Sequence, residues 1–100
     1  VFLEIYEPEN LERALDLDPP LLGVNNRNLT TFETDLGHTL RVGADVPETT
    51  MLVSESGIRS RADVECLAAG GVAAILVGET LMRAESVAEK TSELVGVPRR

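Results

Sequence analysis

The sequence is poor in the residues that build covalently linked or metal-stabilised folds, because it contains a single cysteine, Cys66, and a single histidine, His38. One cysteine excludes a disulfide framework and a cysteine-built metal site within this chain, and one histidine is too few for a His-rich cluster. Cys66 lies near the apolar stripe of an expected helix, and we interpret it as a small core residue. We expect His38, in a polar stretch, to be solvated at the surface. No metal site is expected.

Basic residues are also scarce, since nine Lys and Arg stand against seventeen Asp and Glu and give a net charge of −8. No cluster of basic residues stands out, so neither nucleic acid nor an anionic membrane is expected as a partner. No apolar run approaches the roughly 18 residues of a membrane span, and no basic lead precedes Val1, so no secretory signal is expected. These absences predict one cytoplasmic domain.

The sequence does contain four short apolar runs rich in Val, Ile and Leu: residues 1–6, 21–25, 51–54 and 73–77. Their lack of clean alternation is typical of parallel strands covered on both faces. A segment with helical spacing follows each run. Ser60 with Asp63 and Ser86 with Glu89 read as helix caps, and Gly43 is expected to end the second helix. The pattern predicts four βα units with right-handed crossovers.

Four βα units fit two α/β architectures. One is half of a (β/α)₈ TIM barrel, which needs about 250 residues in full, and the other is a small, open, doubly wound sheet. Length alone does not choose between them. We place the folded unit at residues 1–97 and expect residues 98–100 to form a frayed tail.

Polar residues occur at the end of every predicted strand, where parallel α/β folds bind their ligands. The set comprises Glu4, Asn25, Arg27, Ser56, Gly57, Gly78 and Glu79. Glu4 is a carboxylate in an otherwise apolar strand, and burying a charge is costly unless it is paired or used. It either faces water on an edge strand or acts as a general acid or base in a barrel mouth.

The other strand ends suggest binding. Asn25 and Arg27 carry groups that can fix hydroxyls and a carboxylate, but asparagines are also common in turns for conformational reasons, so both interpretations stay open. Gly57 and Gly78, 21 residues apart, follow successive strands. Glycines there let backbone N–H groups approach an anion, and the last two βα loops of such barrels often bind phosphate.

Four blocks carry a family resemblance: Leu3-Glu4-Ile5, Gly23-Val24-Asn25-Asn26-Arg27-Asn28-Leu29, Val53-Ser54-Glu55-Ser56-Gly57-Ile58 and Leu76-Val77-Gly78-Glu79-Thr80-Leu81-Met82-Arg83. In this order and spacing the sequence resembles the C-terminal half of the indole-3-glycerol-phosphate synthase family of the tryptophan pathway. The resemblance covers nearly the whole chain, and the Asn-Asn-Arg-Asn-Leu block is its most specific part. It implies the fifth to eighth strands of a (β/α)₈ barrel.

For the whole protein, the resemblance implies ring closure of 1-(2-carboxyphenylamino)-1-deoxyribulose 5-phosphate with loss of CO₂ and water, without cofactor or metal. Glu4 would be an active-site glutamate that handles protons, Asn25 would hold a substrate hydroxyl, and Arg27 would order the loop or the anionic part of the substrate. The phosphate cradle would comprise Ser56, Gly57, Gly78 and Glu79. Some family members carry Ser in place of Glu79, so only its backbone N–H would serve the phosphate, because an inward carboxylate would repel it.

The resemblance also implies residues that this chain does not contain. The catalytic lysines of the first and third strands, a second glutamate and an apolar wall for the anthranilate ring would lie upstream of Val1. The one lysine, Lys90, falls in the last expected helix, and we expect it far from any strand end. The chain alone is therefore expected to be inactive, with a phosphorylated substrate and the missing N-terminal half-barrel as partners.

Two other functions fit the sequence. The chain could be a non-catalytic phosphate-binding half-barrel that self-associates through its open sheet edges. It could also be part of another phosphate-binding barrel enzyme, such as a phosphoribosylanthranilate isomerase relative. Sequence upstream of Val1 would separate these alternatives.

Overall fold

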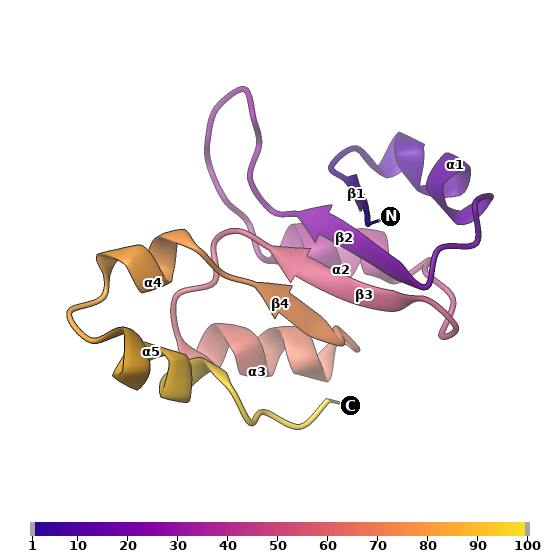
Figure 1. Cartoon of the computed structure of the whole chain (residues 1–100). Coiled ribbons are helices and arrows are strands. Elements are labelled where there is room, and N and C mark those ends of the chain that lie inside the picture. The colour runs from indigo at the N-terminus through magenta and orange to yellow at the C-terminus, as the bar shows by residue number, and fades with distance from the viewer. Residues whose placement is uncertain (1, 100) are drawn as a thin grey trace.

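The computed structural model describes residues 2–99 and contains a four-stranded parallel sheet in the order β1-β2-β3-β4 (Figure 1). The strands are β1 (Leu3–Ile5), β2 (Leu21–Asn25), β3 (Met51–Glu55) and β4 (Ala74–Leu76). Each strand lies within or within one residue of an expected apolar run, and β2 matches its run in full. The predicted α/β fold with a parallel sheet, half of a barrel, is confirmed.

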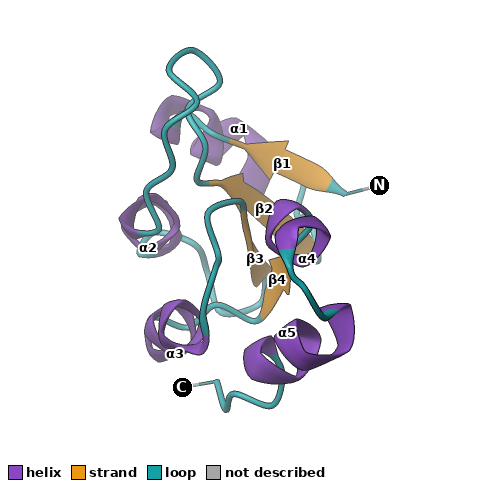
Figure 2. Ribbon diagram, turned by 90° about the vertical axis from the view of Figure 1, so that its left-hand side faces the viewer, coloured by secondary structure: helices purple, strands orange, loops and turns teal. Residues whose placement is uncertain are grey.

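Helices alternate with the strands as predicted. They are α1 (Leu11–Leu15), which follows the 3₁₀ helix η1 (Pro8–Asn10), then α2 (Gly37–Gly43), α3 (Arg61–Ala69), α4 (Glu79–Arg83) and α5 (Val87–Leu94). Figure 2 shows α1, α2 and α3 in a row along one side of the sheet. The short helix α4 lies beyond the carboxyl end of β4 (Figure 1).

The expected helix ends are confirmed. The Ser60 hydroxyl and the Asp63 carboxylate form a reciprocal capping box at the start of α3, and the Ser86 hydroxyl accepts from the Glu89 N–H at the start of α5. Such caps satisfy backbone N–H groups that have no partner inside the helix. Gly43 is the last residue of α2.

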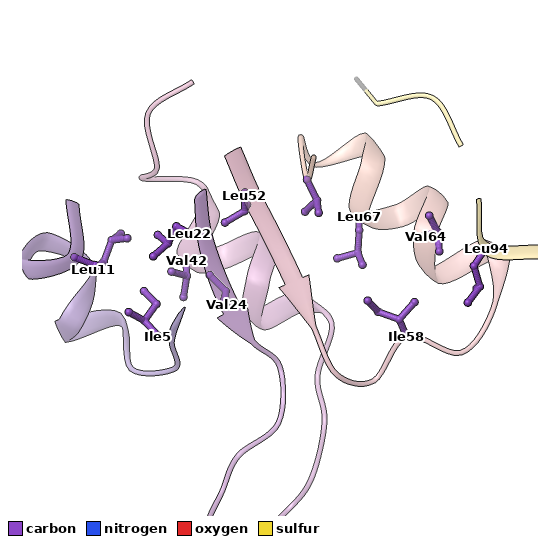
Figure 3. Close-up of a cluster of buried hydrophobic side chains, with 12 residues drawn as sticks. Ile5, Leu11, Leu22, Val24, Val42, Leu52, Ile58, Val64, Leu67 and Leu94 are labelled. Atoms are coloured by element: carbon purple, nitrogen blue, oxygen red, sulfur yellow. The ribbon is translucent and has the colours of Figure 1, made fainter. Parts of the chain in front are cut away.

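The core lies between the sheet and the row of helices (Figure 3). Leu22 and Val24 of β2 are fully buried there and face α2 residue Val42, while Leu67 of α3 covers the β3 side. Because burial of one such side chain contributes about 1.5–3 kcal/mol, this layer supplies most of the stability of the fold.

The opposite face of the sheet is open. Phe2, Leu21, Met51 and Leu76 point away from the helix layer and are 37–55% exposed. Several exposed apolar side chains therefore lie on this face of the sheet. Glu4 lies on the same side, since its neighbour in register is Gly23 and residues side by side in a sheet share a face.

The structure contradicts two expectations about single residues. His38 is only 9% exposed, because it lies inside α2 one turn before buried Val42 and so on the same helix face. Its Nε2 atom lies 2.6 Å from the Tyr6 carbonyl oxygen, and the two rings stack at 4.5 Å. Cys66 is exposed on α3, since Leu67 and not Cys66 occupies the buried stripe.

The end of the chain packs on the domain within the described residues. Arg99 donates from Nε to the Gly71 carbonyl oxygen at 3.1 Å, and Val97 packs against the core. Val1, in the first expected strand, and Arg100, in the expected tail, lie outside the described residues. Within residues 2–99, no helix is both long and apolar enough to cross a membrane.

Candidate functional site

The loop that follows β2 is shaped by the residues expected to bind substrate. The Asn25 Oδ1 atom accepts the Arg27 N–H at 2.9 Å, and the Arg27 Nη1 atom donates to the Phe32 carbonyl oxygen at 2.9 Å. Both side chains therefore order the loop. The amide nitrogen of Asn25 has no protein partner among the described residues and stays available as a donor.

A buried polar cluster holds this loop to the rest of the domain. Asn26 donates from Nδ2 to the Ser54 Oγ atom at 2.8 Å and to the Ser56 carbonyl oxygen at 3.1 Å. The Thr39 hydroxyl donates to Asn26 Oδ1 at 2.6 Å. Because unpaired polar groups are costly in a core, such a fully paired cluster favours a single packing arrangement of the segments that carry it. It connects β2, α2 and β3, and so places Arg27 relative to Ser56.

The two glycines paired in the sequence have different structural roles. Gly57 has φ +78°, and a Cβ atom there would lie 2.9 Å from the Thr34 side chain, so the backbone requires glycine. Ser56 also has a positive φ, of 74°. Gly78 is exposed, and nothing described lies within 4 Å of the position of a Cβ atom. Of these two loops, only the loop after β3 therefore depends on its glycine.

A pocket of about 660 Å³ opens at the carboxyl ends of β3 and β4. Five of the seven expected site residues line it, namely Arg27, Ser56, Gly57, Gly78 and Glu79. The remaining two, Glu4 and Asn25, do not. Four cationic side chains line the pocket and only two carboxylates do, so it favours an anion despite the acidic charge of the whole chain.

Lys90 is one of these cationic residues, which contradicts the expectation that it lies far from any strand end. Its Nζ atom donates to the Arg59 carbonyl oxygen, in the loop after β3, at 3.1 Å. It also donates to Glu93 Oε1 at 3.0 Å, and this hydrogen bond lowers the pKa of the Glu93 carboxyl. The chain folds back after α4, so that α5 lies beside α4 and α3 (Figure 1). This reversal places Lys90 of α5 in the wall of the pocket.

Two carboxyl groups, from Glu4 and Glu55, interact on the open face of the sheet. Glu55 ends β3 and is only 5% exposed, and its Oε2 atom has no hydrogen-bond partner among the described residues. A Cβ atom on Gly23 would overlap the Glu55 carboxylate, so this carboxylate lies across β2 toward Glu4. The absence of a side chain at Gly23 therefore leaves the space in which the Glu55 carboxylate approaches Glu4.

This position changes the acidity of Glu55. Burial, which is the larger cause, together with the nearby charge of Glu4 raises the pKa of Glu55 to about 7. A carboxyl that titrates near neutral pH can both donate and accept a proton there, which is the property of a general acid–base. Glu4 itself is exposed on the edge strand β1.

Comparison with known proteins identifies the family. A sequence model of the family described as "Indole-3-glycerol phosphate synthase" matches residues 1–94. The chain belongs to the indole-3-glycerol phosphate synthase family. Its members form TIM barrels, of which the four-stranded parallel sheet is half.

Relatives named indole-3-glycerol phosphate synthase match nearly the whole chain. The protein of Rhodopirellula baltica is 53% identical over 93 residues, which are 93% of this chain and 36% of the relative. Those of Polynucleobacter asymbioticus and Azospirillum brasilense are each 50% identical, over 94% and 95% of this chain and 35% and 36% of their own lengths. The chain thus spans about a third of these indole-3-glycerol phosphate synthases.

Four charged residues that line the pocket were not expected as site residues, namely Glu55, Arg59, Arg83 and Lys90. Glu55 resembles Glu4 in the sequence, as a carboxylate in an otherwise mostly apolar strand, and this signal could have identified it. The spacing of Arg83, four residues after Glu79, could have indicated the ion pair that the two side chains form at 3.1 Å on α4, but not its place at the pocket.

Proposed function

We propose that this chain supplies the phosphate-binding and proton-transferring part of an indole-3-glycerol phosphate synthase. The whole enzyme would close the indole ring of 1-(2-carboxyphenylamino)-1-deoxyribulose 5-phosphate with loss of CO₂ and water. The observation that carries the proposal is the cationic pocket at the strand ends, where the loop of Ser56 and Gly57 faces the loop of Gly78 and Glu79.

The substrate phosphate would bind in this pocket through backbone N–H groups of Gly57, Gly78 and Glu79, with the Ser56 hydroxyl beside them. Positive φ values at Ser56 and Gly57 support this assignment, because consecutive left-handed residues turn the backbone sharply at the pocket wall. Glu79 would contribute through its N–H alone, since its carboxylate is occupied by arginines.

The substrate's reacting part would then extend toward the two glutamates. Glu4 would move the protons of the ring-closing steps, and the raised pKa of its neighbour Glu55 supports a proton shared between them at neutral pH. Asn25 would donate from its free amide nitrogen to a substrate hydroxyl. Arg27 would bind the anionic part of the substrate.

A partner would complete the barrel. The open apolar face of the sheet would pack against the N-terminal half-barrel, which would also supply the catalytic lysines. The chain alone would then bind phosphate without turning over the substrate.

The test is to fuse this chain to the part of the Rhodopirellula baltica relative that it does not cover. We expect the fusion to form indole-3-glycerol phosphate and the chain alone to form none. A fusion in which both Glu4 and Glu55 are replaced by Gln is the matched control. It measures the product formation that does not depend on these two glutamates. A folded but inactive parent fusion, or turnover by the chain alone, would refute the proposal.

The open sheet face supports a second candidate, a self-associating half-barrel. Exposed Phe2, Leu21, Met51 and Leu76, with free edges at β1 and β4, favour a symmetric pair that approximates a closed barrel. Sedimentation at micromolar concentration tests this candidate. A single species at the monomer mass of 10.8 kDa, independent of concentration, would refute it.

A further inference from the structure

We propose that Glu79 is a positioning residue for Arg27, and the proposal rests on the function proposed above. The Arg27 Nη2 atom donates to Glu79 Oε2 at 3.0 Å, while its Nη1 atom donates to the Phe32 carbonyl oxygen at 2.9 Å. Two contacts, one from its own loop and one from the start of α4, thus hold both ends of the guanidinium group. A planar group held at two points is fixed in orientation.

Glu79 is itself held in place. Its Oε1 atom pairs with the Arg83 Nη2 atom at 3.1 Å, one turn later on α4. The next residue, Thr80, donates its hydroxyl to the Ile58 carbonyl oxygen at 2.6 Å, which ties the start of α4 to the loop after β3. The carboxylate is therefore a fixed bridge between the β2 loop and α4, although a little over half of its side chain is exposed.

The bridge is better explained by positioning than by stability. Exposed ion pairs contribute little to stability, and both partners of the Arg27–Glu79 pair are solvent-accessible. A carboxylate in an anion-binding pocket also opposes the binding of a bare anion. The Glu79 carboxylate fits an anion-binding pocket only if it holds a neighbouring cation in the orientation that binds the anion, because misplaced binding groups lose much of their effect.

Glu79→Gln should have opposite effects on two measurements, the affinity of the chain for inorganic phosphate and the kcat/KM of the fusion. Removal of the negative charge should tighten the binding of inorganic phosphate to the chain, by about two- to fivefold. Loss of the bridge should instead lower kcat/KM of the fusion described above by about tenfold, mainly through KM, because Arg27 no longer meets the substrate in a fixed orientation. Glu79→Asp, which shortens the side chain and keeps the charge, should also lower kcat/KM.

The decisive measurement is a double-mutant cycle. In an Arg27→Ala background, Glu79→Gln should cause no further loss of kcat/KM, because the residue that it positions is gone. Glu65→Gln, an exposed carboxylate change on α3, is the matched control and should leave activity unchanged. An equal loss in both backgrounds, or no loss in the native background, would overturn the proposal.

A second measurement keeps this proposal separate from the proposed function. If the parent fusion is inactive, the proposed function fails, and the Arg27 Nε–H signal in the NMR spectrum of the chain still reports the bridge. We expect one sharp, exchange-protected signal that broadens in Glu79→Gln and persists in Glu65→Gln. An identical Arg27 signal in the native chain and in Glu79→Gln would overturn the positioning role.

Discussion

Replacement of Glu55 by Gln should make the stability of the domain less dependent on pH. The pKa of the Glu55 carboxyl is about 7 in the folded protein and 4.5 when unperturbed, so the folded state binds more protons than the unfolded state between these values. Its stabilising contribution is therefore complete below pH 4.5 and is lost as the pH rises through 7. Glu55→Gln is neutral at every pH and removes this loss.

The structure sets the size of the effect. At about 1.4 kcal/mol for each tenfold change in proton affinity, a rise in pKa from 4.5 to about 7 corresponds to at most about 3.5 kcal/mol. The open sheet face lets water reach Glu4 and screens part of the interaction, so we expect about 1–2 kcal/mol. The difference in unfolding free energy between Glu55→Gln and the native chain should therefore shift by this amount in favour of Glu55→Gln as the pH rises from 5 to 8.

Urea unfolding followed by circular dichroism at pH 5, 6, 7 and 8 measures this difference, with Glu65→Gln as the exposed control. Glu4→Gln should reduce the pH dependence without abolishing it, because burial is the larger cause of the raised pKa and the charge of Glu4 the smaller. A constant difference in unfolding free energy between the native chain and Glu55→Gln from pH 5 to pH 8 would refute the reasoning.

Three further predictions concern the loops and the core. Gly57→Ala should cost about 1–3 kcal/mol of stability because of its positive φ, whereas Gly78→Ala should change it by less than about 0.5 kcal/mol; equal costs in urea unfolding would contradict this. Titration with inorganic phosphate should shift the amide NMR signals of both glycines, and shifts confined to other loops would exclude the phosphate site. Leu22→Ala should cost about 2–5 kcal/mol because Leu22 is fully buried, and a loss below about 1 kcal/mol would mean that the helix layer does not pack as described.

The positions of the strands and helices could be predicted because they depend on local signals. The apolar run at residues 21–25 became β2 without a change of bounds, and the Ser60–Asp63 pair capped α3 as expected. The polar residues at the strand ends were predictable for the same reason, since parallel strands place their carboxyl ends at one edge of a sheet. Five of these residues, including Ser56 and Gly57, do line one pocket.

Which side chains meet across that edge was decided by tertiary structure. Glu55 gains its raised pKa from burial and from the nearby Glu4, and Gly23, on another strand, leaves the room that its side chain occupies. Lys90 reaches the pocket because the chain reverses after α4. His38 is buried by Tyr6, 32 residues earlier in the chain. The sequence alone determines the spacing of apolar residues in each segment, and this spacing predicts a strand or a helix. The burial of a side chain and its charge partners depend on neighbours that only the packed βα units bring together.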